Sequence, residues 1–361
     1  MSNKTPVPTG NYAVGTMTYS VYGDRNIACR VYYPARKEDT GGLSKAVYMT
    51  YEMYKGMKMI MPNPISYKKI CEGGNYSECY DNAPAVPSVR FPLIIFNHGA
   101  GSFRESNSFM CIDLASHGYV VICVAHPKLC ACVELDNGTY EWPEKNLAFK
   151  TYKPYLKGAI NLLKFLKKEE SDEELAKELV EFDNTYCEML LGQMPLWVED
   201  TKRAAQYAKD NLSDMIDFSK GIGATGHSYG GAAAYHLCHS DPEFSCGINI
   251  DGMTVGDFGE KVLDRPFLTV NSNKTYKVIT RMHLYTDKPN YEVRFRDMEH
   301  LGFTDLKYAL PSKSQVGALD PDLMHENLCK CHLEFFDAYL KGTKEAPDLV
   351  SNNVVTVTKH K

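Results

Sequence analysis

Several common features are missing from this 361-residue chain, and each absence narrows what the protein can be. No run of about 18 apolar residues occurs, so the sequence predicts no membrane-spanning helix. Residues 1–16 are polar and lack an apolar run, so no signal peptide is expected. A net charge of −5 gives no basic field, so nucleic acid is not an expected partner. Together these absences predict a cytoplasmic protein.

The chain has 12 cysteines, but none forms a C-x-x-C pair, the spacing typical of zinc and thioredoxin-like sites. The closest pairs have C-x-C spacing: Cys130 with Cys132, and Cys329 with Cys331. We therefore expect no metal site and no cofactor. Cys123 and Cys246 lie inside apolar runs, which favours buried thiols in a reducing compartment. Cys71 and Cys79, in a Gly- and Asn-rich segment, are the pair whose oxidation would contradict this expectation.

Short apolar runs alternate with helical segments in the part of the chain that begins at residue 91. The runs cover residues 91–97, 119–125, 221–226, 246–250, 266–270 and 291–295. Unbroken runs of this length are typical of parallel strands buried on both faces. The segments between them, such as residues 106–117 and 229–240, have helical composition. This alternation predicts an α/β domain with a mostly parallel central sheet and helices on both faces.

The remaining segments are interpreted as additions to a single domain that spans residues 1–343. Residues 17–33 predict an antiparallel hairpin that turns at Gly23 and Asp24. Insertions are expected at about residues 40–90, which are rich in Tyr, Met, Gly and Pro, and at 142–217, which are helical in composition. The charged run at 167–174 predicts a solvated helix boundary. Residues 344–361 are polar and predict a weakly ordered tail with one strand-like piece at 354–357.

Ser228 is the candidate nucleophile because it lies at the centre of a G-x-S-x-G motif, which spans residues 226–230. A strand-like segment precedes the motif and a run of small residues follows it, as a tight strand-to-helix turn requires. The flanking glycines allow this turn to close without a Cβ clash. The N-terminus of the following helix places positive dipole beside a developing oxyanion. In this setting the motif predicts a serine hydrolase of the α/β-hydrolase fold.

His300 is the candidate general base, because a serine hydroxyl needs a base and this fold places the histidine last in chain order. His300 follows the last clear strand, in a loop that can reach the carboxyl end of the sheet. The other histidines after Ser228 fall on helices, in a polar connection or in the tail. They are His236, His239, His283, His325, His332 and His360.

The acid that orients the base is expected at the end of a strand between Ser228 and His300. Two places are considered, after the strand that ends at residue 250 and after the strand that ends at residue 270. The first is followed by Asp251, whereas the loop after the second, residues 271–277, contains no carboxylate. Asp251 is therefore the predicted acid, and Asp257 and Asp264 are the alternatives.

The oxyanion hole requires two backbone N–H groups. One is expected from Tyr229, the residue after the nucleophile, and the other from the loop His98-Gly99-Ala100-Gly101 after the first central strand. Ala100 is the predicted second donor, because the neighbouring glycines allow the backbone to approach a substrate closely.

With these residues in place, the chain resembles the plasma-type (group VII) platelet-activating factor acetylhydrolases and their intracellular type II relatives. The resemblance is strongest at FPLIIFNHGAGSFR, residues 91–104, and at residues 112–119. It also includes GHSYGGA, residues 226–232. Further matching segments are residues 8–15, 31–34, 246–251 and 300–305. Residues 40–90 and 130–150 match less closely.

The resemblance implies calcium-independent hydrolysis of the short sn-2 acyl ester of a phospholipid. It places the nucleophile, acid and base of the family on Ser228, Asp251 and His300, and its oxyanion donors on Ala100 and Tyr229. Ala100 stands where the animal enzymes usually have Leu, and Tyr229 stands where they have Phe.

Two other functions remain open from the sequence. The same catalytic residues would serve a general carboxylesterase or polyester-type hydrolase, and a non-catalytic binding protein on this fold is the third possibility. A lipid substrate would also imply transient contact with a membrane surface. The methionine-rich stretch 49–61 and the stretch 189–197 are the candidate contacts, and buried core is the competing interpretation of both.

Overall fold

A computed structural model describes residues 5–60, 68, 71, 76–165, 167–259, 261–310 and 312–361. Within the insertion expected at 40–90, residues 61–67, 69–70 and 72–75 lie outside the described residues. The strands are β1 (Ala13–Val21), β2 (Ile27–Ala35), β3 (Lys45–Val47), β4 (Tyr76–Asp81), β5 (Phe91–Asn97), β6 (Val120–Ala125), β7 (Val133–Glu134), β8 (Tyr140–Glu141), β9 (Ile216–His227), β10 (Phe244–Ile250), β11 (Phe267–Ser272), β12 (Asn290–Phe295) and β13 (Val355–Lys359). The helices are α1 (Tyr51–Ile60), α3 (Ser108–Ser116), α4 (Lys145–Phe165), α5 (Asp172–Tyr186), α6 (Glu188–Asn211), α7 (Tyr229–Ser240), α8 (Arg281–Leu284), α9 (Lys313–Val316) and α10 (Pro321–Phe336).

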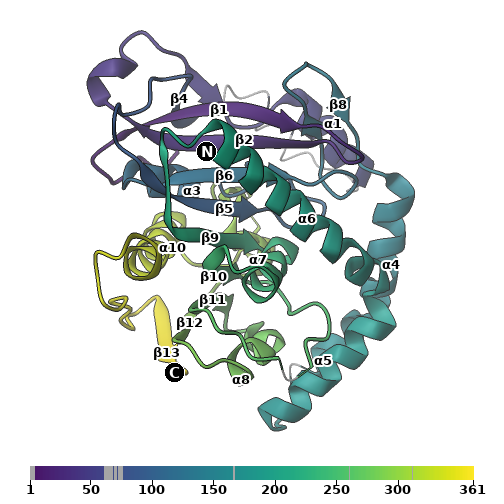
Figure 1. Cartoon of the computed structure of the whole chain (residues 1–361). Helices are drawn as coiled ribbons and strands as arrows, with labels where there is room; N and C mark the ends of the chain where they lie inside the picture. The colour runs from purple at the N-terminus through teal and green to yellow at the C-terminus, as the bar shows by residue number, and fades with distance from the viewer. Residues whose placement is uncertain are drawn as a thin grey trace.

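One large sheet runs through the whole molecule (Figure 1). Its strand order is β13-β12-β11-β10-β9-β5-β6-β2-β1-β4-β3. The six strands from β12 to β6 are parallel to their neighbours, whereas β13 and β2 pair antiparallel at the two sides of this block. The mostly parallel sheet predicted from the alternating runs is confirmed.

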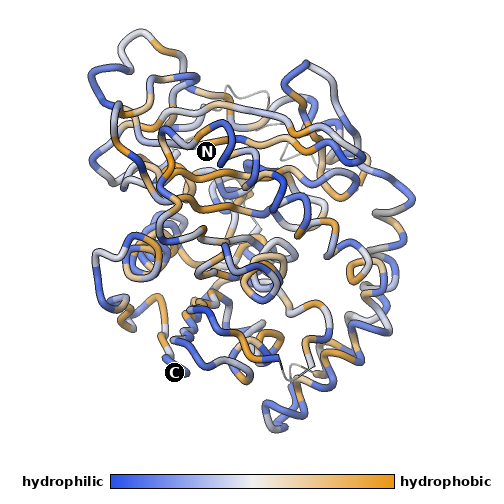
Figure 2. The backbone as a smooth tube through the Cα atoms, in the orientation of Figure 1, coloured by the Kyte–Doolittle hydropathy of each residue, from blue (hydrophilic) through white to orange (hydrophobic). Residues whose placement is uncertain are grey.

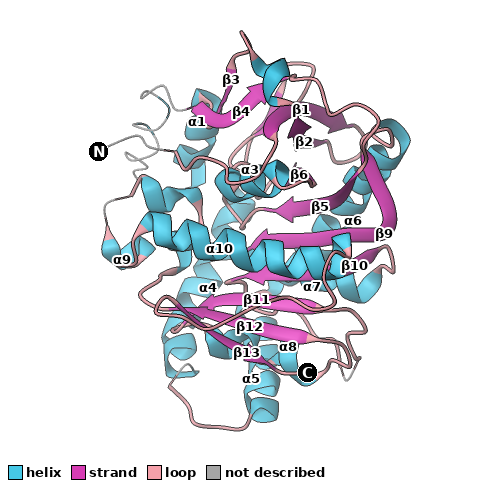
Figure 3. Cartoon of the chain, turned by 90° about the vertical axis from the view of Figure 1, so that its left-hand side faces the viewer, coloured by secondary structure: helices cyan, strands magenta, loops and turns pink. Residues whose placement is uncertain are grey.

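Helices cover both faces of the sheet, which explains the continuous apolar runs of the strands. In β6, Val121 and Cys123 belong to one buried cluster, while Val120, Ile122 and Val124 belong to another. The first cluster includes α3 and α10, which lie side by side on one face (Figure 3), and the second includes α6 and α7 on the opposite face (Figure 1). Figure 2 shows the hydrophobic residues concentrated along these central strands. Since successive side chains of a strand point to opposite faces, both layers must be apolar to bury it.

The N-terminal hairpin extends the parallel block on one side. β1 and β2 pair antiparallel from Ala13 opposite Ala35 to Val21 opposite Ile27, so the connection spans residues 22–26 and is wider than a turn at Gly23 and Asp24 alone. The predicted helical insertion at 142–217 contains α4, α5 and α6. α5 begins with a capping box in which Ser171 and Glu174 bond each other's backbone N–H groups, so the charged run at 167–174 does mark a helix boundary.

The C-terminal segment differs from the expected weakly ordered tail. Its strand-like piece is β13, which pairs antiparallel with β12 and forms one edge of the main sheet. Val354 and Val355 are 4% and 5% exposed and pack against the core that contains α10. Two buried valines and a full set of ladder hydrogen bonds hold this otherwise polar segment in place.

Three methionines of the stretch 49–61 face the interior, and a fourth, Met59, is half-buried. Met49, Met53 and Met57 are buried with Phe103 and Leu306, and Met61 lies outside the described residues. In the stretch 189–197, Met194 and Trp197 are buried as well. Among the described helices, none combines the length and apolar character needed to cross a bilayer. All twelve cysteines, Cys71 and Cys79 included, are without a disulfide bond.

Candidate active site

Ser228 occupies a strained turn between β9 and α7. Its backbone has φ 57° and ψ −123°, a conformation that few non-glycine residues adopt. A Cβ atom at Gly226 would lie 2.3 Å from the Gly230 backbone, and one at Gly230 would lie 2.0 Å from the carbonyl oxygen of Asn97. The turn therefore closes only with glycine at both positions, as the motif predicts.

Strand register brings the predicted acid beside the predicted nucleophile. His227 at the end of β9 is paired with Ile250 at the end of β10, so Ser228 and Asp251 are neighbours at the carboxyl edge of the sheet. The Ser228 N–H donates to the Ile250 carbonyl at 2.8 Å, and the Asp251 N–H donates to the Val270 carbonyl at 2.7 Å. Because all these strands are parallel, their carboxyl ends gather on one edge of the sheet.

The side chains of Ser228, His300 and Asp251 form one hydrogen-bonded chain. His300 Nε2 lies 2.9 Å from Ser228 Oγ, and His300 Nδ1 lies 2.7 Å from Asp251 Oδ2. A carboxylate only accepts, so Nδ1 carries the proton and the Nε2 lone pair faces the serine hydroxyl. The side chain of His300 is 44% exposed, whereas that of Asp251 is fully buried. The structure thus brings together the three residues that chain order selects.

The second oxygen of Asp251 is held by the loop that follows β11. Asp251 Oδ1 accepts hydrogen bonds from the Ser272 N–H at 3.1 Å and from the Thr275 hydroxyl. Burial alone would raise the pKa of Asp251, but the bonds from His300, Thr275 and Ser272 outweigh it and lower the pKa below its usual value. Asp251 is therefore ionised at neutral pH, which is the state that a triad acid requires.

Ser272 and Thr275 contact the predicted acid, and sequence reasoning does not select them. Their loop lacks a carboxylate and for that reason carried no candidate acid, yet it supplies the donors that the acid needs. Its run of Asn, Ser, Lys and Thr directly after a strand was the one available signal.

A second histidine, His227, holds the loop that carries His300. His227 is buried, and its Nε2 donates to the carbonyl oxygen of His300 at 3.0 Å. The two rings lie 4.6 Å apart between centroids at an angle of 36°. Burial is the larger cause and the neighbouring His300 the smaller one of a pKa that is lowered to about 3 at His227. The His227 ring is therefore neutral beside the predicted base, His300.

The two predicted oxyanion donors belong to two segments that adjoin Ser228, the start of α7 and the loop after β5. Tyr229 is the first residue of α7, whose first N–H groups have no acceptor within the helix. The loop that carries Ala100 approaches closely, since a Cβ at Gly99 would lie 3.2 Å from the Cβ of Ser228. The Gly101 N–H holds this loop by donating to the Leu129 carbonyl at 2.7 Å.

Helix α6 supports both donors through Trp197. This fully buried ring meets Tyr229 edge-on at 4.7 Å and His98 edge-on at 5.0 Å, and it stacks on His126 at 3.9 Å. The Tyr229 hydroxyl donates to the Leu190 carbonyl at 2.5 Å, again on α6. The helical insertion at 142–217 thus forms part of the wall behind the predicted oxyanion hole.

The alternative acids are engaged elsewhere. Asp257 pairs with Arg281 at 2.9 Å and accepts from the Gly259 N–H, while Asp264 pairs with Arg265 at 2.9 Å. Both side chains are 62% exposed. Across the described ranges, the one group of three His, Cys, Asp or Glu side chains close enough to hold a metal ion is His283, Glu292 and His360, which shares no residue with this site.

Comparison with known proteins agrees with the hydrolase interpretation of this site. The sequence profile of a family described as "Platelet-activating factor acetylhydrolase, isoform II" matches residues 1–348. The chain belongs to this family. The platelet-activating factor acetylhydrolase of Bos taurus is 27% identical over 323 residues, which cover 85% of this chain and 69% of the bovine protein. The Cavia porcellus protein of the same name is 26% identical over 356 residues, which cover 93% and 78%.

The fold has counterparts among solved structures. A ferulic acid esterase from Streptomyces cinnamoneus superposes with a TM-score of 0.73 over 99% of both chains, at 18% sequence identity. At this identity the match bears on the fold alone, and it confirms the predicted α/β-hydrolase fold. Family and fold together support an ester hydrolase.

Proposed function

We propose that this chain is a serine esterase that removes the short sn-2 acyl group of phospholipids such as platelet-activating factor, through an acyl-serine intermediate. The observation that carries the proposal is the hydrogen-bonded chain Ser228–His300–Asp251 at a strained turn. Membership of the platelet-activating factor acetylhydrolase family supports the choice of substrate.

In the acylation step, Ser228 Oγ attacks the ester carbonyl while His300 Nε2 takes its proton. Asp251 stays ionised and stabilises the imidazolium that forms. The N–H groups of Tyr229 and Ala100 receive the negative charge of the tetrahedral intermediate. His300 then gives its proton to the leaving alcohol oxygen, the C–O ester bond breaks, and an acyl-Ser228 remains.

In the deacylation step, water enters from the exposed side of His300. His300 takes a proton from this water as its oxygen attacks the acyl carbonyl, and then returns the proton to Ser228 Oγ as the acid leaves. Each step uses only side chains and backbone N–H groups of the chain itself. We therefore propose that hydrolysis needs no calcium and no other cofactor.

The oxyanion donors lie against an apolar part of the core. Tyr229 belongs to a buried cluster with Leu129, Met194, Trp197 and Val255, against which Ala100 also packs. This packing supports the proposal because it holds both donors in place. Transient contact with a lipid surface stays a prediction, and sedimentation with phosphatidylcholine liposomes tests it.

The test compares three substrates, each with the wild-type chain and with Ser228→Ala. The substrates are a 2-acetyl phosphatidylcholine, a phosphatidylcholine with a long sn-2 chain, and p-nitrophenyl butyrate. We expect the wild-type chain to prefer the acetyl phospholipid over the other two substrates. A calcium chelator should leave this activity unchanged. Loss of Ser228 should reduce kcat by about 10⁴- to 10⁶-fold.

A matched control is Ser240→Ala, which changes an exposed serine at the opposite end of α7 and should leave turnover unchanged. Hydrolysis of the butyrate with neither phospholipid cleaved would reassign the chain to the general carboxylesterases. Near wild-type turnover by Ser228→Ala would refute the serine mechanism itself.

A further inference from the structure

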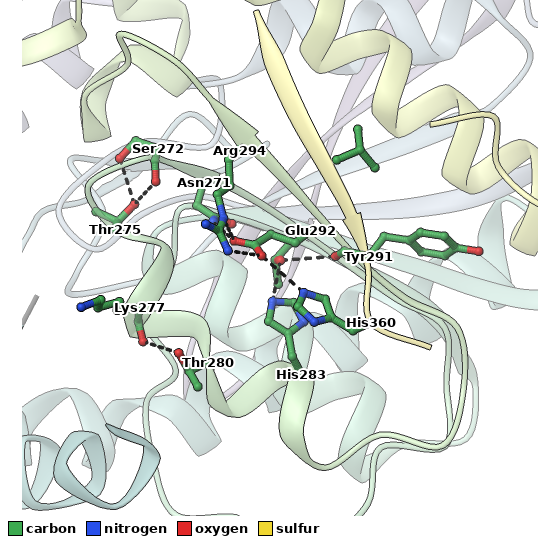
Figure 4. A network of polar contacts seen from close by, with 12 residues as sticks. Asn271, Ser272, Thr275, Lys277, Thr280, His283, Tyr291, Glu292, Arg294 and His360 are labelled. Carbon is green, nitrogen blue, oxygen red and sulfur yellow. Dashed lines mark hydrogen bonds and ion pairs between the residues drawn. The ribbon is translucent and has the colours of Figure 1, made fainter. Parts of the chain in front are cut away.

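A second cluster of two histidines and one carboxylate lies at the edge of the sheet, away from Ser228 (Figure 4). His283 comes from α8, Glu292 from the middle of β12, and His360 from the residue after β13. One nitrogen of each histidine and one oxygen of Glu292 all lie within 4.8 Å of one another. Glu292 is buried, while the side chain of His360 is 27% exposed, so the cluster opens to solvent on the side of His360.

The hydrogen bonds of His283 determine which of its nitrogens is available. The amide nitrogen of Asn290 donates to the Met282 carbonyl at 2.9 Å, so the amide oxygen of Asn290 is the atom that faces His283 Nδ1. That oxygen only accepts, so Nδ1 carries the proton and Nε2 carries the lone pair. The Thr269 hydroxyl lies 3.2 Å from this Nε2 and has a second acceptor in the Tyr291 carbonyl at 3.3 Å, to which it can donate when Nε2 binds an ion. A neutral imidazole whose other N–H donates to an oxygen is the usual form of a metal-binding histidine.

Glu292 is held ionised and oriented toward the two histidines. Its Oε1 accepts from Asn271 Nδ2 at 2.9 Å and from Arg294 Nε. Its Oε2 accepts from Arg294 Nη2 at 2.8 Å and lies 3.3 Å from His360 Nε2. Arg294 also lies over the ring of Tyr276 at 4.0 Å, so its guanidinium has a second contact besides the carboxylate.

We propose that His283, Glu292 and His360 bind a divalent transition-metal ion of the zinc type, with water in the fourth position. Two imidazoles and one carboxylate suit Zn²⁺, Co²⁺ or Ni²⁺, whereas Mg²⁺ and Ca²⁺ take oxygen ligands. Metal–ligand bonds of about 2.0–2.2 Å require the three atoms to converge, and His360 is exposed enough to turn toward the others. The cluster contains no cysteine, so the spacing of the cysteines in the sequence could not reveal it.

The bound ion would join three elements that are separate in the chain. α8, β12 and β13 would be cross-linked at the edge strand, and β12 leads directly to the His300 loop. Because the ion binds the folded arrangement and not the unfolded chain, it should raise the stability of the protein. This role does not depend on the proposed esterase reaction.

The experiment uses the full chain without a polyhistidine tag, after treatment with a chelator. ZnCl₂ is titrated by calorimetry, Tm is measured with and without ZnCl₂, and CoCl₂ is added to record its visible absorption. We expect one ion per chain, a rise in Tm and a Co²⁺ spectrum of low coordination number. His360→Gln, at an exposed position that leaves the core intact, should weaken zinc binding at least about tenfold.

His117→Gln is the matched control, because His117 is similarly exposed and lies beside a buried aspartate on α3; it should bind zinc like the wild type. Arg294→Gln tests the direction in which a neighbouring positive charge changes the affinity for zinc. Removal of a positive charge beside the ion should tighten zinc binding, an effect not expected of a purely structural arginine. The proposal is overturned if the wild-type chain binds no zinc, or if His360→Gln binds it as well as the wild type.

Discussion

Two histidines and one carboxylate lie together at two places in this molecule, with different surroundings. At the carboxyl edge of the sheet, Asp251 holds His300, and His227 lies beneath the His300 ring. In the cluster at the β12–β13 edge, Glu292 faces His360, and His283 stacks on it at 3.9 Å. In both places the buried histidine has a lowered pKa and the carboxylate is kept ionised.

The two clusters differ in what completes them. Asp251 takes its remaining bonds from a backbone N–H and a hydroxyl, so its full negative charge is available to His300. Glu292 has Arg294 against it, which already compensates that charge. The Nε2 of His300 faces the Ser228 hydroxyl, and the Nε2 of His283 faces the Thr269 hydroxyl at 3.2 Å, but Nδ1 of His300 donates to a carboxylate whereas Nδ1 of His283 donates to the amide oxygen of Asn290. A histidine beside a hydroxyl is thus not catalytic by itself, because stabilising its protonated form needs a carboxylate on the other nitrogen.

The largest expected effect distinguishes the predicted acid, Asp251, from the exposed alternative, Asp257. Asp251→Asn should lower kcat by about 10⁴-fold, because the amide no longer stabilises the imidazolium and favours the wrong tautomer of His300. Steady-state kinetics with p-nitrophenyl butyrate measures the loss. Asp257→Asn, at the exposed alternative acid, should stay within about twofold of wild type. A loss below tenfold for Asp251→Asn would mean that this carboxylate is structural only.

The second prediction concerns acid stability at the edge cluster. The pKa of His283 is about 4 in the folded chain against 6.5 for an unperturbed histidine, so between these values the unfolded chain binds one more proton. Stability from this group is present above pH 6.5 and falls as pH decreases toward 4, by up to about 1.4 kcal/mol per pH unit. His283→Gln should remove that slope. Urea unfolding at several pH values, with a chelator present, measures it, and parallel curves for the two proteins would contradict it.

A smaller effect is expected from the loop that holds Asp251. Thr275→Val keeps the shape of the side chain but removes one donor to Asp251 Oδ1, so kcat should fall about tenfold while KM stays near its wild-type value. Thr280→Val is the control, because that hydroxyl donates to the Lys277 carbonyl and does not contact Asp251. Equal kcat for Thr275→Val and the wild type would show that the Ser272 N–H and His300 hold the acid unaided.

The smallest effect tests the histidine beneath the catalytic ring. His227→Phe retains an aromatic ring but loses the hydrogen bond to the His300 carbonyl, which should lower kcat about threefold through a less well-placed loop. The comparison of kcat with KM and with Tm distinguishes this loss from general destabilisation. A fall of 10³-fold or more would instead indicate that His227 acts directly in proton transfer.

Much of the fold follows from local pattern. Strands β5, β6, β10 and β12 lie close to the predicted apolar runs, because a strand buried on both faces must be apolar throughout. The role of the last segment does not follow in this way. β13 is polar apart from a few valines, and only its pairing with β12 and the burial of Val354 and Val355 make it part of the sheet.

The sequence by itself determined the strained turn at Ser228, since two glycines and a strand-to-helix transition are local features. Chain order was enough to select Asp251 and His300 as its partners. Only the tertiary structure decided which groups support them, namely Thr275, Ser272, His227 and Trp197, and which distant residues gather at the β12–β13 edge. These contacts join separate elements, and strand pairing and packing bring them together, which no spacing along the chain records.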